Sequence, residues 1–142
     1  MEIHCDIVTP EGTLFSGEAE TRGITVRVSV SFLPEQSEPD RGRWFWAYHI
    51  RIENDGPMAV QLLTRHWIIT DGRGAKHSVE GEGVVGEQPM IAPGGSFDYV
   101  SCCPLTTPTG HMLGTYHMLG EDGSAFDVEI PKFALLAPAV IG

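Results

Sequence analysis

A glycine-rich segment at residues 81–89 has the pattern in this chain that is most closely tied to known chemistry. Glycine occupies its first, third and sixth positions, as in the G-x-G-x-x-G loops that bind dinucleotide phosphates. Those loops follow a strand and open a helix, whose free N–H groups and dipole face the anion. One hypothesis from this spacing is therefore that the segment binds pyrophosphate or a nucleotide.

The residues around this segment favour a different interpretation. Pro89 and Pro93 follow within a few positions, so no helix can begin where the phosphate-binding motif needs one. Glu80, Glu82 and Glu87 add negative charge, and no Lys or Arg within residues 80–89 offsets it. A carboxylate about 8 Å from a phosphate charge costs roughly 2 kcal/mol at an effective dielectric constant of about 20. We expect a tight connection between strands, in which the glycines adopt positive φ angles.

The sequence lacks the short motifs of common catalytic sites. It contains no G-x-S-x-G, H-E-x-x-H or P-loop pattern, and the spacing of its Ser, His and Asp residues does not favour a catalytic triad. We therefore expect a protein that is not an enzyme and that carries no cofactor.

Metal binding is a weaker alternative that rests on six histidines and several carboxylates. His111 and His117 are separated by about 20 Å along a continuous strand, which is too far for one ion. Asp127 and Glu129 share one face of a strand, and Asp98 is a candidate for the position opposite them. A weak divalent-cation contact there remains open, but a solvated acidic face is the favoured interpretation.

Arg65, His66 and Trp67 are candidates for recognition of a partner protein. Arg and large aromatic residues contribute much of the binding energy in protein interfaces. In the alternative interpretation Trp67 fills the core and Arg65 pairs with a nearby carboxylate, as buried aromatic residues are common in sandwiches. The candidate binding residues are Arg65, His66, Trp67, Gly81, Glu82, Gly83, Gly86, Glu87 and Gln88.

Composition narrows the class of protein further. A chain of 142 residues with 42% hydrophobic residues can bury a core without metal or disulfide staples. Its net charge of −10 disfavours nucleic acid and anionic membranes as partners, and no apolar run could span a bilayer. We expect a cytoplasmic protein in which Cys102 and Cys103 are strand thiols, one facing inward and one outward.

Most of the chain alternates between apolar and polar residues with a period of two, which is typical of half-buried strands. Residues 24–32 and 44–53 show this pattern clearly. In residues 58–70 two apolar pairs break it, which suggests a bulge or burial on both faces. Seven or eight strands and frequent turns predict an all-β antiparallel sandwich of the immunoglobulin or fibronectin type III kind, with a small barrel as the alternative.

Turn residues set the expected strand ends. Residues 71–74 predict a hairpin turn, residues 104–110 a loop, and the last strand, residues 125–133, is expected to end near Pro131. The tails, residues 1–17 and 137–142, are expected to pack loosely. An exposed edge strand could pair two copies into a homodimer.

Four segments carry a resemblance to a known family. They are Arg51-Ile52-Glu53-Asn54, residues 60–71, residues 81–89 and residues 126–131. In order and spacing they resemble the ApaG family, and the likeness runs over residues 18–136. We therefore divide the chain into an N-terminal extension (1–17), an ApaG domain (18–136) and a C-terminal tail (137–142).

The resemblance implies a fibronectin-type sandwich with a genetic link to cobalt and magnesium efflux in bacteria. It also implies a domain that occurs in eukaryotic F-box proteins and in a polymerase-delta-interacting protein, which are settings of partner recognition. No established catalytic activity comes with the family, although its glycine motif has suggested nucleotide or pyrophosphate binding. Our leading hypothesis is a non-catalytic module that binds a protein and is associated with cobalt and magnesium homeostasis. The alternative is a protein that binds a small anion or a divalent cation with residues 81–86.

Overall fold

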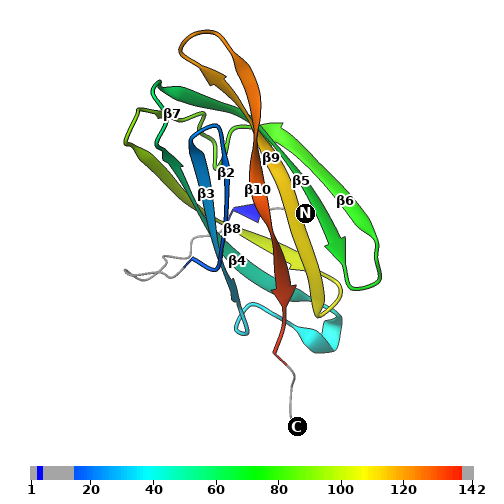
Figure 1. Ribbon diagram of the computed structural model, residues 1–142. Helices are drawn as coiled ribbons and strands as arrows, with labels where there is room; N and C mark the ends of the chain where they lie inside the picture. Colours follow the sequence, from blue (N-terminus) through cyan, green and yellow to red (C-terminus); the bar gives the residue numbers. More distant parts are fainter. Residues whose placement is uncertain (1–2, 5–14, 139–142) are drawn as a thin grey trace.

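The computed structural model describes residues 3–4 and 15–138 and is built almost entirely from strands (Figure 1). Along most of β10 buried residues alternate with exposed ones, as expected for a strand with one face in the core. The strands are β1 (Ile3–His4), β2 (Gly17–Thr21), β3 (Ile24–Phe32), β4 (Trp44–Asn54), β5 (Val60–Asp71), β6 (Lys76–Glu82), β7 (Met90–Ile91), β8 (Ser96–Leu105), β9 (Thr109–Gly120) and β10 (Ala125–Leu136).

Two antiparallel sheets pack face to face. The first has the strand order β1-β8-β4-β3-β2, and the second has the order β10-β9-β5-β6, with β7 also pairing with β5. The predicted antiparallel β-sandwich is therefore confirmed. A short 3-10 turn, Pro39–Arg41, lies in the loop between β3 and β4, and no described helix is long and apolar enough to cross a membrane.

The core lies between the sheets and centres on a group of aromatic side chains. Trp67 on β5 is 0% exposed and packs edge-on against Tyr48, Tyr116 and Phe133, with ring centroids 5.5–6.5 Å apart. Edge-to-face packing at such distances stabilises aromatic pairs beyond the burial of their area. The hydroxyl groups of Tyr99 and Tyr116 form a hydrogen bond across the sandwich. Because these side chains come from both sheets, they join the two layers.

A β-bulge in β5 decides which of its residues enter the core. The pairing with β9 shifts between Leu62 and Thr64, so Leu63 is the extra residue. Leu62 and Trp67 are both buried although their positions differ by an odd number, which a regular strand does not allow. The bulge expected in this segment is thus confirmed.

The predicted strand ends near two prolines are wrong. Pro104 lies within β8, where it pairs with Phe45 of β4. On the other side of β8 the short β1 pairs only with Ser101 and Cys102, so no second strand lies beside Pro104. The N–H group that proline lacks is therefore not required there. Pro131 does not end β10, because the strand absorbs it in an irregularity between Ile130 and Phe133. The hairpin turn at residues 71–74 is confirmed.

The expectations for the cysteines and the N-terminal tail also need correction. Cys102 is disulfide-bonded and is therefore not the strand thiol that was expected, whereas Cys103 keeps its thiol and lies in the core; both side chains are buried. Ile3 of β1 pairs with Cys102 of β8, so this part of the extension joins the first sheet and does not pack loosely. Residues 5–14, with Cys5, and residues 139–142 lie outside the described residues.

The position of Trp67 leads to the first prediction. Replacing it with alanine should lower the free energy of unfolding by about 3–5 kcal/mol, because a large cavity would open between the sheets. Urea denaturation followed by circular dichroism would measure the loss. A change below about 1 kcal/mol would contradict this assignment of Trp67 to the core.

Candidate functional site

The glycine segment forms a tight turn after β6. The amides of Val84 and Glu87 each donate to the carbonyl oxygen of the other, at 2.8 and 2.9 Å. The two residues between them, Val85 and Gly86, have positive φ angles of 43° and 81°, as in type I′ hairpin turns. Val84 is buried, and Val85 is exposed in a conformation that costs a β-branched residue about 1–2 kcal/mol. No α-helix occurs among residues 87–138, so the arrangement that binds phosphate is not present in the described chain.

The segment that contains this turn closes over the bulge of β5. The carbonyl oxygen of Leu63 accepts two hydrogen bonds, each 2.8 Å long, from the amide of Gly83 and the side-chain amide of Gln88. The amide of Leu62 donates to the carbonyl of Pro89 at 3.0 Å. The amides of Gly83, Val84 and Glu87 are thus all used inside the protein and are not available to an anion.

Arg65 connects β5 to the far side of β6. It lies opposite Gly81 in the pairing of the two strands, and its guanidinium occupies the space where a side chain at position 81 would stand. A Cβ at that position would lie 2.8 Å from its Nη1 atom. From there Nη1 donates to the carbonyl oxygens of Glu82 (3.2 Å) and Gly83 (2.8 Å). These carbonyl contacts hold the end of the Arg65 side chain at the edge of β6.

The outer face of the second sheet carries an open groove of about 510 Å³. His66 on β5 is hydrogen-bonded to Ser78 at 2.8 Å and lies 3.6 Å from Glu80, both on β6. On the other side of the groove His117 of β9 is hydrogen-bonded to Asp127 of β10 at 2.8 Å. The groove is lined by Thr64, Arg65, His66, Glu80, Gly81, Glu82, Thr115, His117 and Asp127. Imidazoles, carboxylates and hydroxyls therefore share one polar surface that is open to solvent.

The structure brings most of the predicted site residues together. Residues 65 and 66 on β5 face residues 80 and 81 on β6 and meet at the groove, and the turn with Gly83, Gly86, Glu87 and Gln88 adjoins it. Trp67 lies in the core and does not reach the surface. Thr115, His117 and Asp127 also line the groove, although sequence reasoning did not place them with Arg65. Only the strand order β10-β9-β5-β6 could have revealed this neighbourhood.

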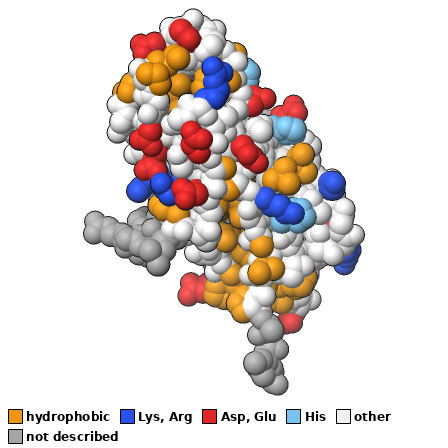
Figure 2. Space-filling view, in the orientation of Figure 1, with side chains coloured by type: hydrophobic (Ala, Val, Ile, Leu, Met, Phe, Trp, Pro, Cys, Tyr) orange, Lys and Arg blue, Asp and Glu red, His pale blue; other side chains and the backbone are white. Residues whose placement is uncertain are grey.

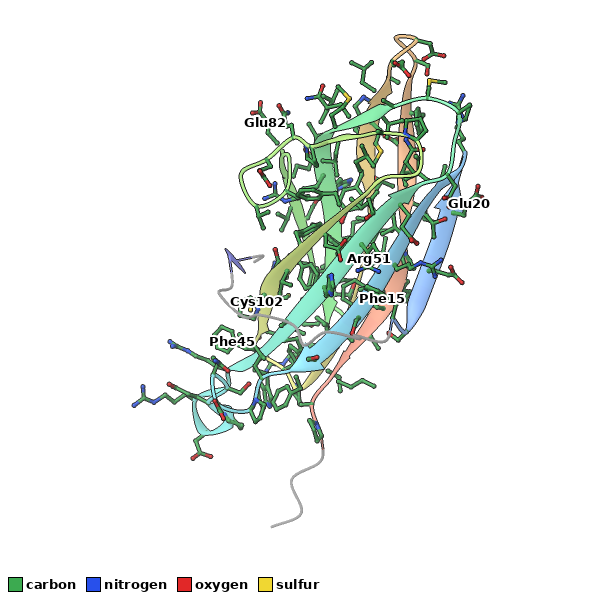
Figure 3. All side chains as sticks on the ribbon, turned by 90° about the vertical axis from the view of Figure 1, so that its left-hand side faces the viewer. Phe15, Glu20, Phe45, Arg51, Glu82 and Cys102 are labelled. Carbon is green, nitrogen blue, oxygen red and sulfur yellow. The ribbon has the colours of Figure 1, made fainter. Side chains whose placement is uncertain are left out.

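The suggested grouping of Asp98 with Asp127 and Glu129 is wrong. Asp98 lies on β8 in the first sheet, where it accepts hydrogen bonds from Arg51 at 3.0 Å and pairs with His49 at 2.8 Å. Arg51 also stacks over the ring of Phe15 at 5.2 Å, and Figure 3 shows the two side chains close together on that sheet. Among the described residues no three His, Cys, Asp or Glu side chains are grouped so that they could hold a metal ion.

Exposed apolar side chains extend the surface beyond the groove. Met90 on β7 and Leu119 on β9 both pair with Gln61 of β5, and their exposed fractions are 66% and 36%. Val85, at the tip of the glycine turn, is 38% exposed. Figure 2 shows hydrophobic, histidine and charged side chains interspersed on the side of the molecule where β9, β5 and β6 lie. Such a mixture of apolar and polar groups is typical of protein-binding surfaces.

Fold and surface together define a β-sandwich protein with a groove on one sheet and a hydrogen-bonded glycine turn beside it. The ApaG domain family matches residues 34–120. A protein named ApaG from Afipia carboxidovorans is 56% identical over 86% of this chain and 94% of its own, and one from a Methylobacterium species is 54% identical over 87% and 95%. A crystal structure of a Bordetella pertussis protein described as ApaA superposes with a TM-score of 0.79 at 49% identity and covers 82% of this chain and 95% of its own. The chain belongs to the ApaG family, and none of these names states a catalytic activity.

The three glycines of the segment have different steric roles, which leads to a graded prediction. Gly83→Ala should cost about 3 kcal/mol of unfolding free energy, because its Cβ would lie 2.2 Å from the carbonyl oxygen of Glu87 and its φ is 64°. Gly81→Ala should cost about 1–2 kcal/mol through displacement of the Arg65 guanidinium. Gly86→Ala should cost about 1 kcal/mol, from its positive φ alone.

Urea denaturation of the three variants would test this order. Gly74→Ala is the matched control for Gly86→Ala, because Gly74 also has a positive φ of 85° with no atom within 4 Å. Equal costs at all three positions of the segment would contradict the assigned roles.

A third prediction concerns the coupling between Arg65 and Gly81. If Gly81→Ala acts only by displacing the guanidinium, the double variant with Arg65→Ala should be no less stable than Arg65→Ala alone. The coupling free energy should then be about 1 kcal/mol or more, whereas Arg65→Ala and Gly86→Ala should be additive within about 0.5 kcal/mol. Full additivity of Arg65→Ala and Gly81→Ala would show that their contact does not stabilise the fold.

Proposed function

We propose that this protein is a non-catalytic binding module that recognises a partner protein with the outer face of its second sheet. The observation that carries the proposal is the concentration of exposed large apolar side chains around the groove. Of the four such side chains among the described residues, Val85, Met90 and Leu119 belong to this region, and Leu136 lies at the far end of β10. Contiguous apolar groups with polar groups at their margin mark interaction surfaces.

The glycine turn supports this function by holding part of the surface rigid. Glu87 and Val85 lie in a turn that is fixed to β5 through Gln88 and Gly83. A surface that is already ordered loses less conformational entropy when a partner binds. The strained φ of the exposed Val85 is a further indication, because such strain tends to accumulate at functional positions.

Protein recognition is better supported than the binding of a small anion or a cation. Amides of the glycine segment donate within the protein, and Glu82 and Glu87 would repel pyrophosphate or a nucleotide. The groove carboxylate of Asp127 already accepts a hydrogen bond from His117. We propose that any role in cobalt and magnesium homeostasis is exercised through the partner protein. The cytoplasmic location expected from the sequence is part of this proposal.

Substitutions on this surface should weaken partner binding without lowering the stability of the fold. Met90→Asp and Glu87→Lys should each reduce capture of the partner from a native lysate at least tenfold, because they alter exposed contact groups, and the melting temperature should change little. Capture on immobilised full-length protein, quantified by mass spectrometry, and thermal denaturation would give the two readouts.

Leu136→Asp is the matched control, since Leu136 is 63% exposed and Met90 is 66% exposed, but the two occupy different regions. It should capture the partner as the native protein does. Equal capture by all variants would move the binding surface away from the groove and the glycine turn.

A further inference from the structure

The outer edge of β6 is a long strand edge that the fold leaves unpaired. Residues 76–82 pair with β5 on one side, and no strand within residues 3–4 or 15–138 pairs with the other side. Figure 1 shows β6 at the border of its sheet. The residues of β6 are mostly exposed, whereas β10, at the opposite edge of the same sheet, packs against β2 and β3. An edge of this kind presents N–H and C=O groups to another chain.

The pairing with β5 determines which backbone groups face outward. The amide of Gly83 bonds to the carbonyl of Leu63, the residue opposite it, and this fixes the alternation along the ladder. The backbone groups of Gly81 and Val79 therefore point to β5, and those of Ser78 and Glu80 point to the free edge. Arg65 already donates to the carbonyl of Glu82, so the part of the edge open to a new strand lies before that residue.

The charges along β6 differ at its two ends. Lys76 lies at the start of the strand, and Glu80 and Glu82 lie at its end. These side chains share the outer face of the sheet with Ser78, because they occupy alternate positions. An antiparallel copy of the same strand would bring the positive end against the acidic end.

We propose that two copies of this chain form a dimer by antiparallel pairing of their β6 strands around a twofold axis. In the register that uses the open backbone groups, Ser78 faces Ser78 of the second copy, and Lys76 faces Glu80 in both directions. Each facing pair of this type exchanges two backbone hydrogen bonds. A register shifted toward the end of the strand would place Glu80 against Glu80 of the second copy. The repulsion between these two carboxylates excludes that register. The interface is closed and self-complementary, as twofold dimers require.

The dimer goes beyond the proposed function and does not depend on it. Pairing at the β6 edge makes the two second sheets continuous and keeps their outer faces on the same side. The grooves of both copies then lie on one extended surface, where a partner with two binding segments could engage both. Such two-point attachment raises the overall affinity without any new contact in either groove.

Charge reversal on the full-length protein tests the proposal. Sedimentation velocity and light scattering at submillimolar concentration should show a dimer for the native chain. Lys76→Glu and Glu80→Lys should each raise the dissociation constant roughly tenfold or more, because each places like charges opposite one another at two symmetric positions. The double variant, Lys76→Glu with Glu80→Lys, restores opposite charges at both positions and should recover the native dissociation constant.

Two further variants control for unrelated effects. Ser78→Pro removes an N–H that faces the free edge and not β5, so it should abolish the dimer while circular dichroism still shows a folded sandwich. Lys132→Glu, an equivalent charge reversal on β10, should leave the dimer unchanged. A native chain that remains monomeric, or a dimer that both single charge reversals and Ser78→Pro leave intact, would overturn the proposal.

Discussion

The extra residue in β5 is the constraint on which the second sheet depends. If β5 were regular, the face that buries Leu62 would continue through Thr64 and His66, and Trp67 would point to solvent. The bulge reverses this parity, so Trp67 joins the core and His66 reaches the groove. A bulge leaves backbone groups without partners in the ladder, and buried polar groups without partners are costly. The glycine segment supplies the missing partners, because the Leu63 carbonyl accepts from Gly83 and Gln88.

The same reversal turns Arg65 toward the inner side of its sheet, where a charge cannot stay without polar partners. Arg65 lies next to the edge strand, and Gly81 leaves room for its guanidinium to cross that strand. There the carbonyl oxygens of Glu82 and Gly83 accept its hydrogen bonds. Bulge, arginine and glycine segment are therefore one structural unit. Its surface consequence is the groove, which is bordered by polar residues that the parity change moved outward.

The sequence predicted the sandwich because alternation of apolar and polar residues follows directly from burial of one face of a strand. It also predicted the strand connection at residues 81–89, since the prolines there exclude a helix and the carboxylates oppose a bound phosphate. It placed strand ends wrongly at Pro104 and Pro131, because a proline is tolerated wherever one side of a strand lacks a partner or the pairing is irregular. The sequence could not predict that His117 and His66 line the same groove, because their proximity depends on the strand order and no local pattern encodes that order.

The spacing of glycines indicates the positions where a side chain does not fit, but it does not indicate which group prevents the fit. In a dinucleotide-binding loop the excluding group is a phosphate or a closely packed helix. Here a side chain at position 81 would collide with a guanidinium, and one at position 83 would collide with the backbone of Glu87. At position 86 the positive φ angle disfavours a side chain. Three independent requirements of a bulged sheet thus generate the spacing of a ligand-binding motif. The hydrogen bonds of the neighbouring amides distinguish the two cases, since an amide that already donates within the fold cannot also hold an anion.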